Sequence, residues 1–277
     1  MRSRPQPASR IAEPAGDAGT QAIASLAMAG SLDGRRVLIS GASSGIGEAT
    51  ALAMVAEGAS VALGARRKER LDELASKIES GGGKAVAIEA DITDENQAAN
   101  LVESAHAELG GLDTLVNNAG VMLLGPLQGA DPAEWRTMIE VNCLGLLYCT
   151  HYALPLIRDG GGGDVVNVSS VAGRTAALGS GVYNMTKWGV VGYSESLRQE
   201  GAHIGVRVTC VEPGFVDTEL QGHNENPMVV DQIEKMKEAT GKVLEAADIA
   251  NAVVYAVSQP EHVSINEILV RPSGQTR

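Results

Sequence analysis

The chain has 277 residues and a formal net charge of −12 at pH 7, and 44% of its residues are hydrophobic but only 3% are aromatic. The acidic balance argues against nucleic acid as a partner, because phosphate binding needs a basic surface. No apolar run approaches the roughly 20 residues that span a bilayer, so we also expect no membrane partner. A core poor in aromatic residues must be built mainly from Ala, Val, Leu and Ile, which suits a parallel sheet covered by helices.

The first thirty residues combine arginines and prolines with small residues. Glu13 and Asp17 interrupt a transit-peptide pattern, and the apolar stretch 22–29 is too short, and too far from its charged end, for a signal peptide. We therefore expect a disordered N-terminal extension over 1–30 and one folded domain over 31–277.

Cysteine and histidine usage indicates a reduced protein without a metal. Cys143, Cys149 and Cys210 lack any Cys-x-x-Cys spacing, and the five histidines show no metal-ligand spacing. Without a signal peptide, the cysteines fit reduced core residues better than a disulfide framework. We expect a cytoplasmic location.

Short apolar runs alternate with helical patterns along the domain. The expected strands are 37–39, 61–63, 85–88, 114–116, 165–168, 206–211 and 268–270. The expected helices are 48–57, 67–79, 95–109, a long one opened by Asp131 as N-cap, one around 183–197, and 246–257. Such alternation predicts right-handed crossovers and a parallel sheet. The predicted fold is therefore α/β: a single doubly wound domain with a seven-stranded parallel sheet and helices on both faces.

A glycine-rich segment follows the first expected strand directly, and it reads Ser40-Gly41-Ala42-Ser43-Ser44-Gly45-Ile46-Gly47. Because glycines have no Cβ atom, backbone amides can approach a pyrophosphate there, and the following helix N-terminus adds a favourable dipole. The position between a strand and a helix makes this a strong signal for a dinucleotide site in a Rossmann-type domain.

A second pattern, Tyr183-Asn184-Met185-Thr186-Lys187, places a tyrosine and a lysine four residues apart. On a helix the two side chains share a face, so their polar ends can meet at one site. A neighbouring ammonium favours the phenolate and lowers the pKa of a tyrosine from its usual value of about 10. An exposed helix face shows the same spacing, so the assignment depends on the remaining motifs.

Together these motifs resemble the short-chain dehydrogenase/reductase family from residue 32 to the C-terminus. The matching positions are Gly41-x-x-x-Gly45-x-Gly47, Asn117-Asn118-Ala119-Gly120, Asn142, Ser170, Tyr183-x-x-x-Lys187 and Pro213-Gly214. The resemblance implies that 31–277 is a catalytic domain and that the protein is a homotetramer. Segments 122–126, 218–223 and 266–272 resemble the branch that contains 3-hydroxy acid dehydrogenases, serine dehydrogenase-like enzymes and clavulanic acid dehydrogenase, most closely the last.

The resemblance also implies a nicotinamide cofactor. NAD-preferring members end the second strand with an acidic residue, whereas this chain continues with Arg66 and Arg67, which can bind the 2′-phosphate of NADP(H). Alternatively, both arginines only begin a solvated helix. The implied cofactor-binding residues are Gly41, Ser43, Ser44, Gly45, Ile46, Gly47, Arg66, Arg67, Asp91, Ile92, Asn117, Ala119, Gly120, Tyr183, Lys187, Pro213, Gly214, Val216 and Thr218. For Asn117 a second role stays open, that of tying neighbouring strands together.

By the same resemblance the reaction interconverts a carbonyl (an aldehyde, ketone or 3-oxo acid) and an alcohol. The implied catalytic residues are Asn142, Ser170, Tyr183 and Lys187. Ser170 would donate to the substrate oxygen, Tyr183 would act as general acid/base, Lys187 would hold the nicotinamide ribose, and Asn142 would hold a water that links Lys187 to solvent. Ser169 is the rival of Ser170, and Asn142 can instead be satisfied within its helix.

The expected substrate pocket combines segment 122–124, Ala172 and a lid over 219–241, with polar contacts from His223, Asn224 and Glu225. A surface histidine is usually solvated, so the role of His223 stays open. Two other functions remain possible: an NADP(H)-binding redox sensor without turnover, and an epimerase or dehydratase on the same fold. An intact Ser170, Tyr183 and Lys187 favours the oxidoreductase, because a sensor needs no proton relay.

Overall fold

The computed structural model describes residues 32–224 and 226–276, so the predicted extension over 1–30 lies outside the described residues. Within this part of the chain, seven strands form one parallel sheet in the order β3-β2-β1-β4-β5-β6-β7. The strands are β1 (Arg36–Ser40), β2 (Ser60–Ala65), β3 (Lys84–Glu89), β4 (Thr114–Asn117), β5 (Gly163–Val168), β6 (Val206–Pro213) and β7 (Glu267–Val270). Each contains one of the runs that the sequence predicts, and the seven-stranded parallel sheet is confirmed.

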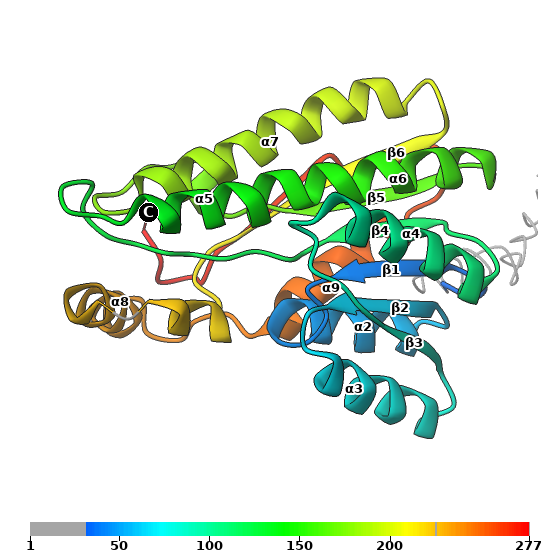
Figure 1. Cartoon of the computed structure of the whole chain (residues 1–277), viewed down its shortest axis with the longest axis horizontal. Helices are drawn as coiled ribbons and strands as arrows, with labels where there is room; N and C mark the ends of the chain where they lie inside the picture. Colours follow the sequence, from blue (N-terminus) through cyan, green and yellow to red (C-terminus); the bar gives the residue numbers. More distant parts are fainter. Residues whose placement is uncertain (1–31, 225, 277) are drawn as a thin grey trace, which may run out of the picture.

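Helices cover both faces of the sheet, which confirms the doubly wound architecture (Figure 1). One layer is formed by α2 (Gly45–Ala56), α3 (Lys68–Ser80) and α9 (Ala246–Val257), and the other by α4 (Glu95–Leu109), α6 (Leu146–Asp159) and α7 (Gly181–Gly201). Neighbouring side chains of a strand enter opposite cores. Val37 and Ile39 pack in the same core as Met54 of α2, whereas Leu38 packs with Leu101 of α4.

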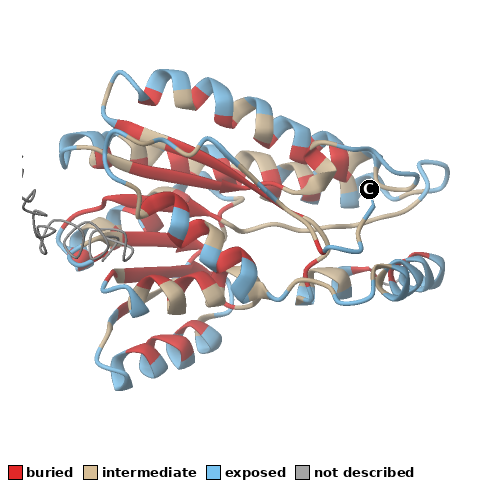
Figure 2. Cartoon of the chain, turned by 180° about the vertical axis from the view of Figure 1, so that it is seen from behind, coloured by how far each residue is buried: buried red, intermediate tan, exposed pale blue. Residues whose placement is uncertain are grey.

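The five inner strands are largely buried, the edge strands β3 and β7 only in part, and the outward faces of the helices are exposed (Figure 2). This pattern follows from burying apolar side chains, which contributes roughly 25 cal/mol per Å² of apolar surface removed from water. Among residues 32–224 and 226–276, no helix is both long and apolar enough to cross a membrane.

Two helical features depart from the sequence-based prediction. The long helix opened by Asp131 is confirmed at its start, where the Asp131 side chain accepts from the Ala133 N–H at 2.8 Å. It divides, however, into α5 (Pro132–Ile139), a π-helical segment η1 (Glu140–Gly145) and α6. The expected lid contains a short 3₁₀ helix, η3 (Glu219–His223), and α8 (Pro227–Thr240), which was not predicted. In Figure 1, α8 lies beside the ends toward which the strands run.

Candidate active site

A cavity of about 330 Å³ lies at the carboxyl ends of the strands, where the strand order reverses between β1 and β4. Ligands of open α/β sheets bind at such switch points. The sequence-predicted residues that line it are Gly41, Ser43, Ser44, Gly45, Ile46, Arg66, Arg67, Asp91, Ile92, Ala119, Gly120, Ser170, Tyr183, Lys187, Pro213, Gly214, Val216 and Thr218. The structure thus brings most of the predicted site together, whereas Gly47, Asn117 and Asn142 lie behind its wall.

The turn between β1 and α2 leaves space for an anionic ligand. Gly41 and Gly45 have φ angles of +68° and +56°, in the left-handed region that favours glycine. A Cβ atom on Gly47 would lie 2.3 Å from the carbonyl oxygen of Gly41, so Gly47 shapes the turn without lining the cavity. Ser44, the N-cap of α2, makes no side-chain capping bond to a described residue. The first-turn N–H groups of α2 can therefore receive a phosphate.

Asn117 and Asn118 have different roles although they are neighbours. The Asn117 amide donates to Thr150 Oγ1 and to Asn167 Oδ1, both at 2.9 Å, and so ties β4 to α6 and β5. Asn118 lines the cavity, and its amide donates to the carbonyl oxygens of Ser40 and Gly41, both at 3.1 Å. The structure therefore places Asn117 in the sheet, in agreement with the alternative role of tying neighbouring strands together. It places Asn118 against the glycine turn.

Ser170, Tyr183 and Lys187 meet in the cavity. The Ser170 hydroxyl accepts from the Ala172 N–H at 3.1 Å and donates to the Pro213 carbonyl at 3.4 Å. Lys187 Nζ lies 5.9 Å from the centroid of the Tyr183 ring. The rival Ser169 donates to the carbonyl oxygen of Lys187 at 2.9 Å and is buried, so its hydroxyl is committed to α7. This arrangement favours Ser170 as the serine that meets a ligand.

Burial controls the protonation of this cluster. It raises the pKa of Tyr183 to about 12, against the opposing effect of the hydrogen bond with Ser170. It also lowers the pKa of Lys187 to about 8. In the protein alone the pKa of Tyr183 is thus raised, whereas the sequence-based expectation was a pKa lowered by Lys187. The ammonium instead donates to the Val168 carbonyl at 2.9 Å, and the loss of solvation of Tyr183 is the larger effect.

Asn142 braces the cavity wall from the π-helical segment. Its Oδ1 accepts from the Val121 N–H at 2.8 Å, and its Nδ2 donates to the Val121 carbonyl at 2.9 Å. A Cβ atom on Gly120 would lie 3.3 Å from Asn142 Oδ1 and 3.7 Å from Lys187 Nζ, so these two side chains flank Gly120 closely. The side-chain amide of Asn142 is therefore hydrogen-bonded to the loop that carries Val121. Neither the water-holding role nor the helix-internal alternative predicts this contact. π-bulges are frequent at functional sites.

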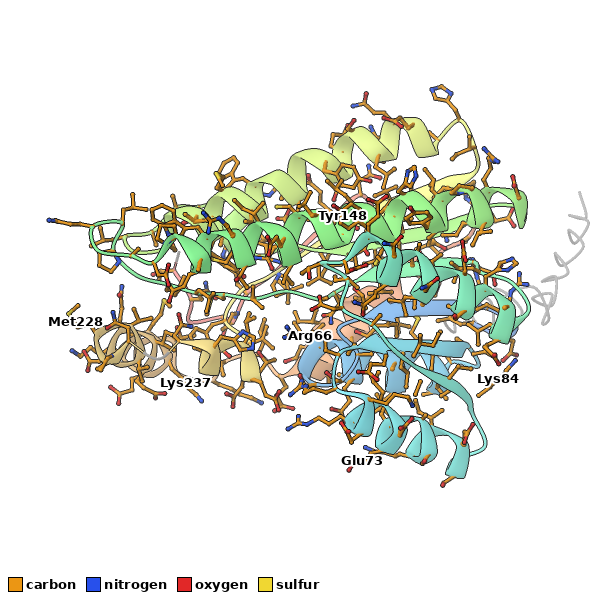
Figure 3. All side chains as sticks on the ribbon, in the orientation of Figure 1. Arg66, Glu73, Lys84, Tyr148, Met228 and Lys237 are labelled. Carbon is orange, nitrogen blue, oxygen red and sulfur yellow. The ribbon has the colours of Figure 1, made fainter. Side chains whose placement is uncertain are left out.

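The two arginines after β2 differ in their contacts. Arg67 is fastened to the glycine turn, because its Nε and Nη2 donate to Ser43 Oγ at 3.1 and 3.0 Å and Nη2 also donates to Ser44 Oγ at 2.8 Å. Arg66 is exposed and borders the cavity, at the end of β2 that faces α8 (Figure 3). Both arginines therefore border the same cavity as the glycine turn.

An ion pair between a partly exposed arginine and a buried glutamate joins the loop after β5 to the end of β6. Arg174, at the end of the short 3₁₀ helix η2 (Val171–Gly173), donates through Nε and Nη2 to the Glu212 carboxylate at 2.7 and 2.8 Å. Glu212 is fully buried and directly precedes Pro213. The pair therefore connects the segment that begins with Ser170 to the segment that begins with Pro213. No sequence motif indicates this contact.

The expected substrate region is organised by Asn224. Its Oδ1 accepts from the Leu124 N–H at 2.7 Å and its Nδ2 donates to the Met122 carbonyl at 3.1 Å, so its amide fastens the lid to segment 122–124 and is committed to the backbone. His223 borders the cavity, where burial lowers its pKa and Arg66 and Arg67 lower it further. Glu225 lies outside the described residues.

These features define a nucleotide-binding α/β domain with a tyrosine, a lysine and a serine gathered beside the nucleotide site. The chain belongs to the short-chain dehydrogenase family of oxidoreductases, whose model, described as short chain dehydrogenase, matches residues 35–228. The family predicted from the sequence is thereby confirmed.

Two relatives illustrate the range of sequence similarity. A segment of glycine betaine reductase from Emericella nidulans is 42% identical over 247 residues, which are 89% of this chain but only 19% of that protein. An uncharacterized oxidoreductase of Staphylococcus saprophyticus is 40% identical over 244 residues, which are 87% of this chain and 96% of that protein.

Two solved structures share the fold. The closed form of a serine dehydrogenase complexed with NADP⁺ has a TM-score of 0.80 and 33% identity, covering 87% of this chain and 96% of that chain. An alcohol dehydrogenase from the archaeon Thermococcus sibiricus, complexed with 5-hydroxy-NADP, has a TM-score of 0.78 and 27% identity, covering 88% of this chain and 98% of that chain. The narrower resemblance to clavulanic acid dehydrogenase stays a prediction.

Proposed function

We propose that the protein is an NADP(H)-dependent oxidoreductase acting on CH–OH groups, which interconverts an aldehyde, ketone or 3-oxo acid and the corresponding alcohol. The observation that carries this proposal is that Ser170, Tyr183 and Lys187 share one cavity with the glycine turn and with Arg67. Fold alone does not decide function, but a proton-transferring tyrosine beside a dinucleotide site does limit the chemistry.

The residues present fit NADP(H). The open N–H groups of α2 suit the pyrophosphate, Asp91 and Ile92 border the cavity on the adenine side, and Arg66 and Arg67 suit the 2′-phosphate. The serine dehydrogenase and the archaeal alcohol dehydrogenase, each complexed with an NADP species, support the same assignment. When bound, the nicotinamide would supply or accept the hydride.

The chain's own contribution is proton transfer and orientation. The hydroxyls of Ser170 and Tyr183 would hold the substrate oxygen by hydrogen bonds, and Tyr183 would protonate the developing alkoxide in reduction. A phenol with a pKa of about 12 is protonated at neutral pH and is still a stronger acid than an alcohol, so it is suited to donation. In oxidation the phenol must lose its proton, and the Lys187 ammonium, 5.9 Å from the ring, is a charge that favours this.

The test is to offer the protein a panel of substrates and to monitor the oxidation of NADPH by its absorbance. We expect NADPH to be oxidised with at least one class among aldehydes, ketones and 3-oxo acids, and NADH to react more slowly, because no carboxylate follows β2 to hold an unphosphorylated ribose. Tight NADPH binding without turnover across the panel would favour the redox sensor. A preference for NADH would contradict the roles of Arg66 and Arg67.

We also propose a cytoplasmic homotetramer assembled through the helices that carry Asn142 and Tyr183, and through β7. In support, α7 exposes Met185 and Trp188, and the edge strand β7 exposes Leu269. Exposed apolar side chains on adjoining elements suit an interface between copies. Light scattering on the purified chain is expected to give the mass of four copies, and a monomer mass would contradict the assembly.

A further inference from the structure

Glu219 of η3 occupies an anion position between two arginines of different segments. Its Oε2 lies 2.8 Å from Arg67 Nη1, and its Oε1 lies 2.6 Å from Arg70 Nη1. These arginines hold the pKa of the carboxyl at about 2, so it is ionised at every physiological pH. Each carboxylate oxygen of Glu219 thus accepts a hydrogen bond from a different guanidinium group.

The same donors form the region expected to receive the 2′-phosphate of the proposed cofactor. Arg67 is fastened to Ser43 and Ser44 at the cavity wall, and Glu219 borders that cavity as well. A phosphate monoester and a carboxylate both take charge-assisted hydrogen bonds from guanidinium groups. The two anions cannot both use Arg67 Nη1 at close range, because like charges at a few ångströms repel.

We infer that Glu219 is an intramolecular competitor of the cofactor's 2′-phosphate, and that Arg70 joins Arg67 in binding this phosphate once Glu219 has left. The inference rests on the proposed NADP(H) dependence and names two further specificity-determining residues. It requires η3 to move when the phosphate binds. Thr218, the N-cap of η3, and His223, its last residue, border the cavity, so phosphate binding is coupled to the region that covers the substrate.

The experiment compares two nucleotide fragments that lack the nicotinamide. Adenosine 2′,5′-bisphosphate carries the 2′-phosphate and 5′-AMP does not, so the ratio of their dissociation constants by calorimetry isolates the phosphate contribution. In the Glu219→Gln variant we expect adenosine 2′,5′-bisphosphate to bind about threefold to fivefold more tightly, toward the upper end of what exposed ion pairs contribute, and 5′-AMP to change by less than about twofold. In Arg70→Gln, adenosine 2′,5′-bisphosphate should bind more weakly.

Glu73→Gln is the matched control. Glu73 lies on α3, acts electrostatically on Arg70, and belongs to the outer helix rather than to the cavity wall (Figure 3). This variant loses the same charge without opening the Arg67 site, so its affinities should change by less than about twofold. If Glu73→Gln gained as much affinity for adenosine 2′,5′-bisphosphate as Glu219→Gln, the gain would be explained by the change in net charge. That result would overturn the inference.

Two results separate this inference from the proposed function. If the wild-type chain binds adenosine 2′,5′-bisphosphate more tightly than 5′-AMP but Glu219→Gln gains nothing or loses affinity, the competitor role is overturned while the NADP(H) assignment stands. If neither the wild-type chain nor Glu219→Gln binds adenosine 2′,5′-bisphosphate more tightly than 5′-AMP, both are overturned.

Discussion

Replacing Tyr183 with phenylalanine is expected to lower kcat/KM for carbonyl reduction by about 10³-fold, within the range that a positioned general acid contributes. The substitution removes the only proton that this side chain can donate and preserves the ring that packs in the cavity. Binding of NADPH is expected to remain within about threefold, because the loss of a proton donor acts on the transition state and not on the ground state.

The matched control is Tyr193→Phe. Tyr193 lies on the same helix, and its hydroxyl interacts with Thr150, away from the cavity. In steady-state kinetics the kcat/KM of this variant should lie within about twofold of wild type. Thermal unfolding should show a cooperative transition for both variants, which establishes that both are folded. Retention of turnover in Tyr183→Phe would contradict the assignment of the general acid.

Replacing Lys187 with methionine is expected to abolish turnover and to raise the free energy of unfolding. Burial lowers the pKa of Lys187 to about 8 from a reference value of 10.5, so the folded chain carries a cost of up to about 3 kcal/mol when the amine is charged. Methionine removes that cost but loses the charge-assisted hydrogen bond to the Val168 carbonyl, which contributes about 1.5–3 kcal/mol. A net gain of up to about 1.5 kcal/mol near neutral pH is therefore expected.

The pH dependence distinguishes this cause from a packing effect. Below the folded pKa of about 8, both the folded and unfolded lysine are charged and the cost is complete. As the pH rises from about 8 toward 10.5, the folded lysine loses its proton first, so wild type gains stability and the advantage of the variant declines. Urea unfolding across this pH range measures the difference in the free energy of unfolding between wild type and Lys187→Met. The control is Lys77→Met, which replaces an exposed lysine. A destabilised variant, or a pH-independent difference, would contradict the explanation.

The strands and most helices could be predicted because they depend on local periodicity. Leu38 between Val37 and Ile39 shows how one apolar run supplies both cores. For Asn117 the sequence left two roles open and could not decide between them, because the choice depends on which residue ends the strand pairing and hence on which side its amide points. The contact of Asn118 with the glycine turn was not predicted for the same reason. The contact of Glu219 with Arg67 joins residues far apart in the chain, and no local pattern reports it.

The π-helical segment and the pKa directions were also outside the reach of sequence reasoning. The sequence around Asn142 reads as ordinary helix, and its extra residue per turn is stabilised by contacts with the backbone of Val121. The pKa of Tyr183 depends on how completely the folded chain removes the ring from water, which the spacing of Tyr183 and Lys187 does not contain.

The Arg174–Glu212 pair has a consequence for how the site opens. Separating the loop after β5 from the end of β6 would leave the fully buried Glu212 carboxylate without Arg174 in a medium of low dielectric, at a cost of several kcal/mol. The loop that begins at Ser170 and the segment that begins at Pro213 should therefore exchange their amide hydrogens together, as one cooperative unit. Fluctuations of the protein would expose the whole reacting end or none of it, so partly assembled sites would be rare in the native ensemble.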